Sequence, residues 1–168
     1  MSTPETTDQG ARPLDAARLA SLVTTALERT AFVMAEPIET DAADTGAIRF
    51  ATRVTFTGAA AGECLIAASE GFTRELIAGF LGVDASETDP AQQGQDALNE
   101  LANIIAGMVI RELGNQTNRI FLGLPARVEA LSVGPTLRGA DTLSCGLDSC
   151  GELLLVVVRV PSAIAKAA

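Results

Sequence analysis

Residues 152–160 read ELLLVVVRV, a run of apolar and largely β-branched residues. A half-exposed strand alternates apolar with polar residues, whereas a continuous apolar run is typical of a strand covered on both faces. A second strand is expected over Leu143–Leu147, and Ser149–Gly151 between the two supplies turn residues. The C-terminal part of the chain therefore predicts two strands joined by a turn, the second of them deep in a sheet.

Further strands are expected earlier in the chain. Residues 48–56 alternate apolar Ile, Phe, Val and Phe with Arg, Ala and Thr, which indicates a strand with one wet face. The glycine-bounded turn Gly58–Gly62 and the apolar Cys64–Ile66 follow, so this strand is expected to fold back as a hairpin. After the Gly and Pro residues of 123–125, another strand is expected over Arg127–Val133.

Three amphipathic helices complete the pattern. They are expected from Ala16, after the capping residue Asp15, to about Val33, over Gly71–Leu81, and from about Ala91 to Leu113, where Gly114 and Asn115 follow. The order along the chain is α-β-β-α-α-β-β-β. This order favours an α+β fold with long helices packed on a mostly antiparallel sheet.

The length of 168 residues fits one domain. We expect a disordered N-terminal tail over residues 1–13, a single domain over 14–162, and a C-terminal tail over 163–168. The N-terminus lacks a basic stretch before an apolar run, and no apolar run reaches the roughly 18 residues of a membrane span. We therefore expect a cytoplasmic protein without a membrane segment.

Composition excludes several classes of chemistry. The net charge of −9 lacks the cationic footprint that nucleic acids and anionic membranes require. Histidine is absent, and the sole lysine is Lys166, so imidazole catalysis and a Schiff-base lysine in the folded body are excluded. Cys64, Cys145 and Cys150 show no Cys-x-x-Cys spacing, and we expect reduced thiols that bind no metal.

The long helix carries the candidate chemistry. At about 100° per residue, Asp96, Glu100, Asn103 and Gly107 fall within roughly 60° of one another, a set we call the polar stripe. The apolar residues of the opposite face are Leu98, Leu101, Ile105, Met108 and Val109. The stripe is therefore expected to face outward, with Ile104 and Ile110 as apolar edges.

A carboxylate and a carboxamide one turn apart can pair with a cation and hold a water, and neither group needs to titrate. The alternative is that Asp96, Glu100 and Asn103 form an ordinary solvated helix face. Gly107 is also open to two explanations, because an interior helical glycine costs about 1 kcal/mol relative to alanine. Either a partner approaches closely there, or the helix packs tightly against a neighbouring strand.

The stretch 96–125 resembles a known family. Asp96, Glu100 and Asn103, followed by Pro125, match the Asp/Ser-x3-Glu-x2-Asn signature and later proline of the CheC, CheX and FliY phosphatases of bacterial chemotaxis. The single motif, the length and the order of elements look most like the CheX members. The first helix has Glu28 but Ala31 three residues later, so no second copy of the motif is present. The resemblance implies an α+β fold and one active face per chain.

The resemblance also implies a function. It is that of a phosphatase that hydrolyses the aspartyl phosphate of a CheY-like response-regulator receiver domain in a bacterial cytoplasm. Glu100 and Asn103 are the implied catalytic residues: the acid pairs with a receiver lysine and the amide positions the hydrolytic water. Asp96, Ile104 and Gly107 would contact the partner. No cofactor is expected in this chain, Mg²⁺ is expected in the receiver, and a homodimer is implied. The alternative is a non-catalytic module that docks on a receiver or another signalling protein.

Overall fold

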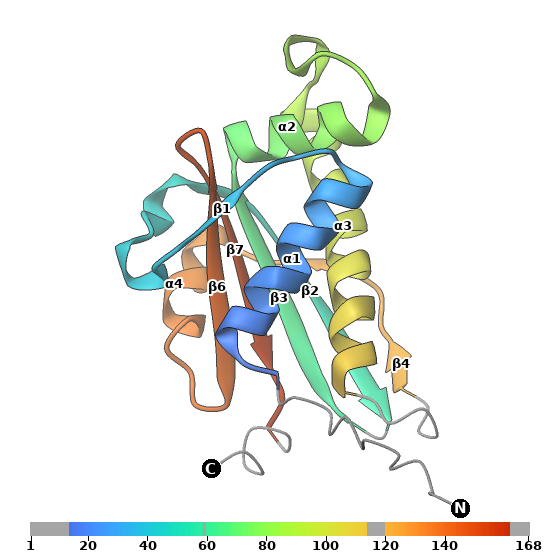
Figure 1. Ribbon diagram of the computed structural model, residues 1–168, viewed down its shortest axis with the longest axis vertical. Helices are drawn as coiled ribbons and strands as arrows, with labels where there is room; N and C mark the ends of the chain where they lie inside the picture. Colours follow the sequence, from blue (N-terminus) through green and yellow to red (C-terminus); the bar gives the residue numbers. More distant parts are fainter. Residues whose placement is uncertain (1–13, 59, 114–119, 162–168) are drawn as a thin grey trace, which may run out of the picture.

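The computed structural model describes residues 14–58, 60–113 and 120–161 (Figure 1). The tails expected over residues 1–13 and 163–168 lie outside the described residues, as do Gly114 and Asn115 at the expected end of the long helix. Among the helices described, none has the length and apolarity needed to cross a membrane.

One antiparallel sheet forms the centre of the fold. Its strands are β1 (Glu36–Ile38), β2 (Ile48–Gly58), β3 (Gly62–Ser69), β4 (Ile120–Leu122), β5 (Ala126–Arg127), β6 (Thr142–Ser149) and β7 (Glu152–Arg159). The order across the sheet is β1-β6-β7-β3-β2-β4, and β5 also pairs with β2. Both expected hairpins, β2–β3 and β6–β7, are present.

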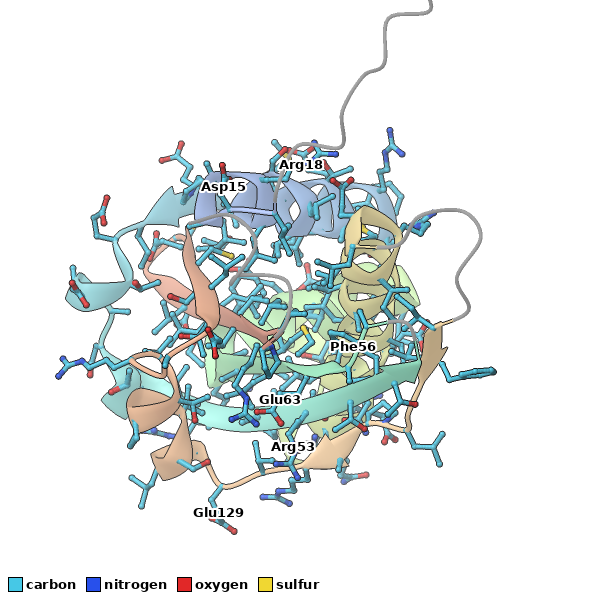
Figure 2. All side chains as sticks on the ribbon, turned by 90° about the horizontal axis from the view of Figure 1, so that it is seen from below. Asp15, Arg18, Arg53, Phe56, Glu63 and Glu129 are labelled. Atoms are coloured by element: carbon cyan, nitrogen blue, oxygen red, sulfur yellow. The ribbon has the colours of Figure 1, made fainter. Side chains whose placement is uncertain are left out.

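The helices lie on both faces of this sheet. They are α1 (Ala16–Thr30), α2 (Glu70–Leu81), α3 (Pro90–Leu113) and the short α4 (Val133–Thr136), with 3-10 turns η1 (Thr40–Ala42), η2 (Thr45–Ala47), η3 (Ala85–Glu87) and η4 (Ala130–Ser132). The first three helices pack on one face, while η4 and α4 cover part of the other (Figure 1). Figure 2 shows Phe56 of β2 on the helix side of the sheet and Arg53 on the opposite side. The predicted α+β class is confirmed.

Strand β7 is covered on both faces, as its apolar run predicts. Leu154, Val156 and Val158 pack into the core beneath the helices. The alternate residues Leu153, Leu155 and Val157 pack into a second core against the η4–α4 segment. The strand lies between β6 and β3, so its hydrogen-bonding edges are also satisfied within the chain.

Local signals set most helix ends. The Asp15 carboxylate accepts a hydrogen bond from the Arg18 amide at 2.7 Å and caps α1. Ser69 caps α2, and Gly82 ends it in the left-handed conformation. Helix α1 ends at Thr30, three residues before the expected end at Val33, because Phe32 adopts a positive φ of 55° and turns the chain.

The prediction of a strand over Arg127–Val133 is wrong. Only Ala126 and Arg127 pair with β2 in the ladder, after which the Ser132 amide donates to the Glu129 carbonyl in η4 and the chain continues into α4. Strands β1 and β4 were not expected, since three residues are too few to show alternation.

Candidate functional site

Helix α3 presents the polar stripe to the surface. On its inner face Leu98, Leu101 and Val109 are fully buried against the sheet and the other helices, and Met108 is half-buried. On the opposite face Asp96 and Glu100 are exposed, while Asn103 is half-buried. The helical period that places apolar residues inward thus carries this carboxylate–amide pair outward.

The polar groups of the stripe have no partners in the part of the chain that the structure describes. There, the side chains of Asp96, Glu100 and Asn103 make neither a hydrogen bond nor an ion pair. Glu100 and Asn103 lie three residues apart, which is a rise of about 4.5 Å along the helix. Both groups are therefore accessible to an incoming cation, water or phosphoryl group.

Gly107 lies at the C-terminal end of the stripe over open space. A Cβ atom built there would meet no heavy atom within 4 Å outside the local helix backbone, among the described residues. Of the two explanations left open by the sequence, tight packing against a neighbouring strand is therefore excluded. Ile104 is half-buried and packs against the main core, so it forms an edge of the stripe.

A polar network beside the stripe was not anticipated. The Thr52 hydroxyl of β2 donates to Asn99 Oδ1 at 2.8 Å, and the Gln95 amide donates to the same oxygen at 3.0 Å. The Thr52 hydroxyl also lies 3.3 Å from the Ala126 carbonyl, directly after Pro125. This network ties α3 to β2 and to the segment that begins at the motif proline. The sequence signal for this network was the pair Gln95 and Asn99, two amides four residues apart on the part of α3 between the stripe and the apolar face.

A second tie joins α3 to α1. The Arg18 guanidinium donates to both carboxylate oxygens of Glu112, at 2.6 and 3.1 Å. The hydrogen bond from Arg18 outweighs the opposing effect of desolvation and, with smaller charge effects of Arg18 and Arg111, holds the pKa of Glu112 below its ordinary value. The pair lies near the surface, so its contribution to stability is small, but the fork geometry fixes the C-terminal part of α3 relative to α1.

The described residues offer no group of three or more Cys, Asp or Glu side chains placed to hold a metal ion. Cys64 and Cys145 are buried, and desolvation raises the pKa of each thiol to about 12. The stripe itself contains two carboxylates and one amide. What it can do chemically is pair with a cation and orient a water.

The comparisons with known proteins agree with this architecture. Residues 50–133, half of the chain, match the family model described as chemotaxis phosphatase CheX. Among curated proteins, no sequence matches significantly.

Similar solved structures share the fold at low sequence identity. One is CheX in the CheX–CheY–BeF3–Mg²⁺ complex from Borrelia burgdorferi, with 14% identity, a TM-score of 0.64, and coverage of 87% of this chain and 97% of that chain. Another is the chemotaxis protein CheX from Vibrio vulnificus, with 16% identity, a TM-score of 0.65, and coverage of 84% and 95%. A CheC-like superfamily protein from a Shewanella species has 14% identity and a TM-score of 0.64, with coverage of 86% of this chain and 95% of that chain.

These likenesses define the class of fold first: an antiparallel sheet under three packed helices, shared with the solved CheX structures and with a CheC-like protein. The family model then fixes the group within that class, and the chain belongs to the CheX chemotaxis phosphatase family. The matched residues 50–133 include the whole polar stripe and Pro125.

Proposed function

We propose that this protein hydrolyses the aspartyl phosphate of a CheY-like receiver domain by inserting the exposed face of α3 into the receiver's active site. The observation that carries the proposal is the outward carboxylate–amide pair of Glu100 and Asn103, which has no partner among the described residues. Membership of a chemotaxis phosphatase family supports it. So does the complex of a similar CheX with CheY, BeF3 and Mg²⁺.

The proposed roles follow from the chemistry of the two side chains. The Asn103 amide accepts a hydrogen bond from the attacking water and holds it in line with the phosphorus. The Glu100 carboxylate pairs with the receiver's lysine and positions α3 in the site. Asp96, Ile104 and Gly107 form the surrounding contact, with Gly107 allowing the receiver backbone to approach closely.

The reaction needs little else from this chain. Water adds to phosphorus, the bond from phosphorus to the aspartyl oxygen breaks, and inorganic phosphate leaves with the water's proton while the receiver carboxylate is restored. An acyl phosphate is already activated, so positioning and charge placement suffice. The Mg²⁺ ion belongs to the receiver substrate, and this chain contributes no cofactor. The absence of histidine from the sequence is compatible with this mechanism.

The proposed assembly is a homodimer in the bacterial cytoplasm. The apolar run of β7 does not support it, because that strand is buried within one chain. A different surface does: Phe121, Leu122 and Leu124 are exposed on and beside β4, the terminal strand of the sheet. An apolar sheet edge is a template for pairing with a second copy. The polar stripe faces away from the sheet, so this pairing leaves it open on each protomer.

A phosphate-release assay tests the proposal against a non-catalytic docking module. The CheY-like receivers of the source organism are phosphorylated with a small phosphodonor, which is then removed, and loss of the aspartyl phosphate is timed with and without this protein. A phosphatase accelerates the loss at substoichiometric amounts. A docking module leaves the decay rate unchanged or slows it, and that result would contradict the proposed activity.

A further inference from the structure

A small groove lies between α2 and α3 at the N-terminal end of the polar stripe. Ile77, Phe80, Leu81 and Ala97 form its apolar walls, and Gln93 and Asp96 form part of its rim. Its volume is about 270 Å³. This is below the range of about 300–1,000 Å³ that is usual for small-molecule sites, so the groove suits a single inserted side chain better than a free ligand.

The groove has an apolar wall that the fold does not cover. Leu81 is the last residue of α2 and lies one helical turn after the buried Ile77, yet its own side chain is 57% exposed. The fold places Asp96, which is exposed, on the opposite side of the same groove. The chemistry presented is thus a hydrophobic surface next to one carboxylate.

The groove is continuous with the proposed docking face, because Asp96 belongs to both. The polar stripe from Asp96 to Gly107 is about 16 Å long and one side chain wide. A specific protein–protein interface covers about 800 Å² on each partner, far more than this stripe offers. A receiver seated on Glu100 and Asn103 therefore has to cover neighbouring surface, and the α2–α3 groove adjoins its first residue.

We propose that this groove receives an apolar side chain of the phosphorylated receiver, and that a basic receiver residue beside it pairs with Asp96. The inference rests on the proposed function, since it takes the receiver to dock on the polar stripe. Leu81 and Phe80 then act as determinants of which receiver is bound. They supply hydrophobic contact area at the edge of the interface, whereas Glu100 and Asn103 act at the phosphoryl group.

Binding of activated receivers to Leu81 variants tests this inference. The probes are the source organism's CheY-like receivers, each activated with beryllofluoride and Mg²⁺, and the receiver bound most tightly by the wild-type protein is used throughout. Leu81→Asp places a charge in the groove, Leu81→Met retains its apolar wall, and Asn103→Ala removes only the water-positioning amide. Leu131→Asp is the matched control, because Leu131 is 93% exposed in η4 on the other side of the sheet.

Leu81→Asp is expected to raise the Kd for the activated receiver, and the KM for dephosphorylation, at least tenfold, with kcat within about twofold of wild type. Leu81→Met and Leu131→Asp are expected to match wild type in both. Equal Kd values for Leu81→Asp and Leu131→Asp would overturn the groove proposal. If the wild-type protein and Asn103→Ala are equally inactive while Leu81→Asp still weakens binding, the phosphatase proposal fails and the groove stands.

Discussion

Glu100 and Asn103 have different parts in the proposed chemistry. The carboxylate fixes the position of α3 by pairing with a cation, and the amide orients a neutral water. Neither side chain is held by a partner among the described residues, so each is available without breaking an existing bond. Loss of either group is therefore expected to affect binding or dephosphorylation of the receiver and to leave the core intact.

Glu100→Ala is expected to weaken both receiver binding and turnover. If the Glu100–lysine pair is desolvated in the complex, its loss costs about 2–5 kcal/mol of binding free energy, measured by titration calorimetry with the activated receiver. Glu28→Ala is the matched control, since Glu28 is also an exposed helical glutamate but lies on α1 without an amide three residues later. Wild-type affinity and rate in the Glu100 variant would restrict this residue to a solvated role.

The three cysteines are expected to differ in reactivity. Burial raises the pKa of the Cys64 and Cys145 thiols to about 12, so at pH 8 both stay protonated and shielded, whereas Cys150 is exposed in the β6–β7 turn. An aromatic disulfide reagent should modify one thiol per chain rapidly under native conditions and three after denaturation. Rapid native modification of two or three thiols would contradict the described core.

For single residues, the sequence predicts exposure that follows from the helical repeat, and it misses contacts that arise when distant elements pack together. The exposure of Asp96 and Glu100 follows from the helical repeat. The bond from Thr52 to Asn99 joins residues 47 positions apart, so no local pattern contains it. Leu81 looks like the end of an ordinary amphipathic helix until α2 packs beside α3 and leaves a groove between them.

Helix α3 is the element on which the site depends, and its two interior glycines have opposite surroundings. A Cβ atom at Gly94 would lie 2.9 Å from side-chain atoms of Phe50 and Thr73, so this glycine permits close packing with β2 and α2. Among the described residues, a Cβ atom at Gly107 would meet no heavy atom within 4 Å outside the local helix backbone. Close packing within the chain thus explains Gly94, and we attribute Gly107 to close approach of the docked receiver.

Alanine substitution at these two positions is expected to change stability in opposite directions. Gly107→Ala should stabilise the fold by about 1 kcal/mol through helix propensity. Gly94→Ala should destabilise it by about 1–3 kcal/mol through overpacking. Urea denaturation measures both changes. Gly107→Ala is also expected to weaken receiver binding, and a variant that is more stable but binds as tightly as wild type would remove Gly107 from the interface.

The elements with a clear period were predicted well. Helix α3 is described as far as Leu113, its expected last residue, and β2, β6 and β7 lie within two residues of their expected positions. Three-residue strands such as β1 and β4 carry no period and depend on pairing with β6 and β2. The segment after Arg127 looks like a strand by composition, yet its carbonyls are used in the turns of η4 and α4.

At the scale of the whole molecule, the proposed partners are assigned to two exposed apolar surfaces. One is the α2–α3 groove beside the polar stripe, and the other is the β4 edge with Phe121, Leu122 and Leu124. We assign the first to the receiver and the second to another copy of the chain. The two surfaces lie toward opposite ends of α3, the groove beside α2 and the other at β4 (Figure 1), so we expect that both partners can bind at once.

Leu124→Asp is expected to convert the proposed dimer into a monomer. Light scattering over a dilution series should give twice 17.3 kDa for wild type and 17.3 kDa for the variant. Leu124 is 89% exposed, so the substitution should leave the fold intact by circular dichroism. A wild-type monomer at every concentration would refute the dimer, and a dimeric Leu124 variant would move the contact away from β4.

The most direct test of the central claim is the decay of a phosphorylated receiver in the presence of Asn103→Ala. The variant is expected to have the unfolding midpoint of wild type and to bind the activated receiver, because Asn103 makes no hydrogen bond among the described residues. Its stimulated dephosphorylation is expected to fall on the order of 10²-fold, the cost of losing an oriented water. Stimulated decay at the wild-type rate, in a variant of normal stability, would contradict the account.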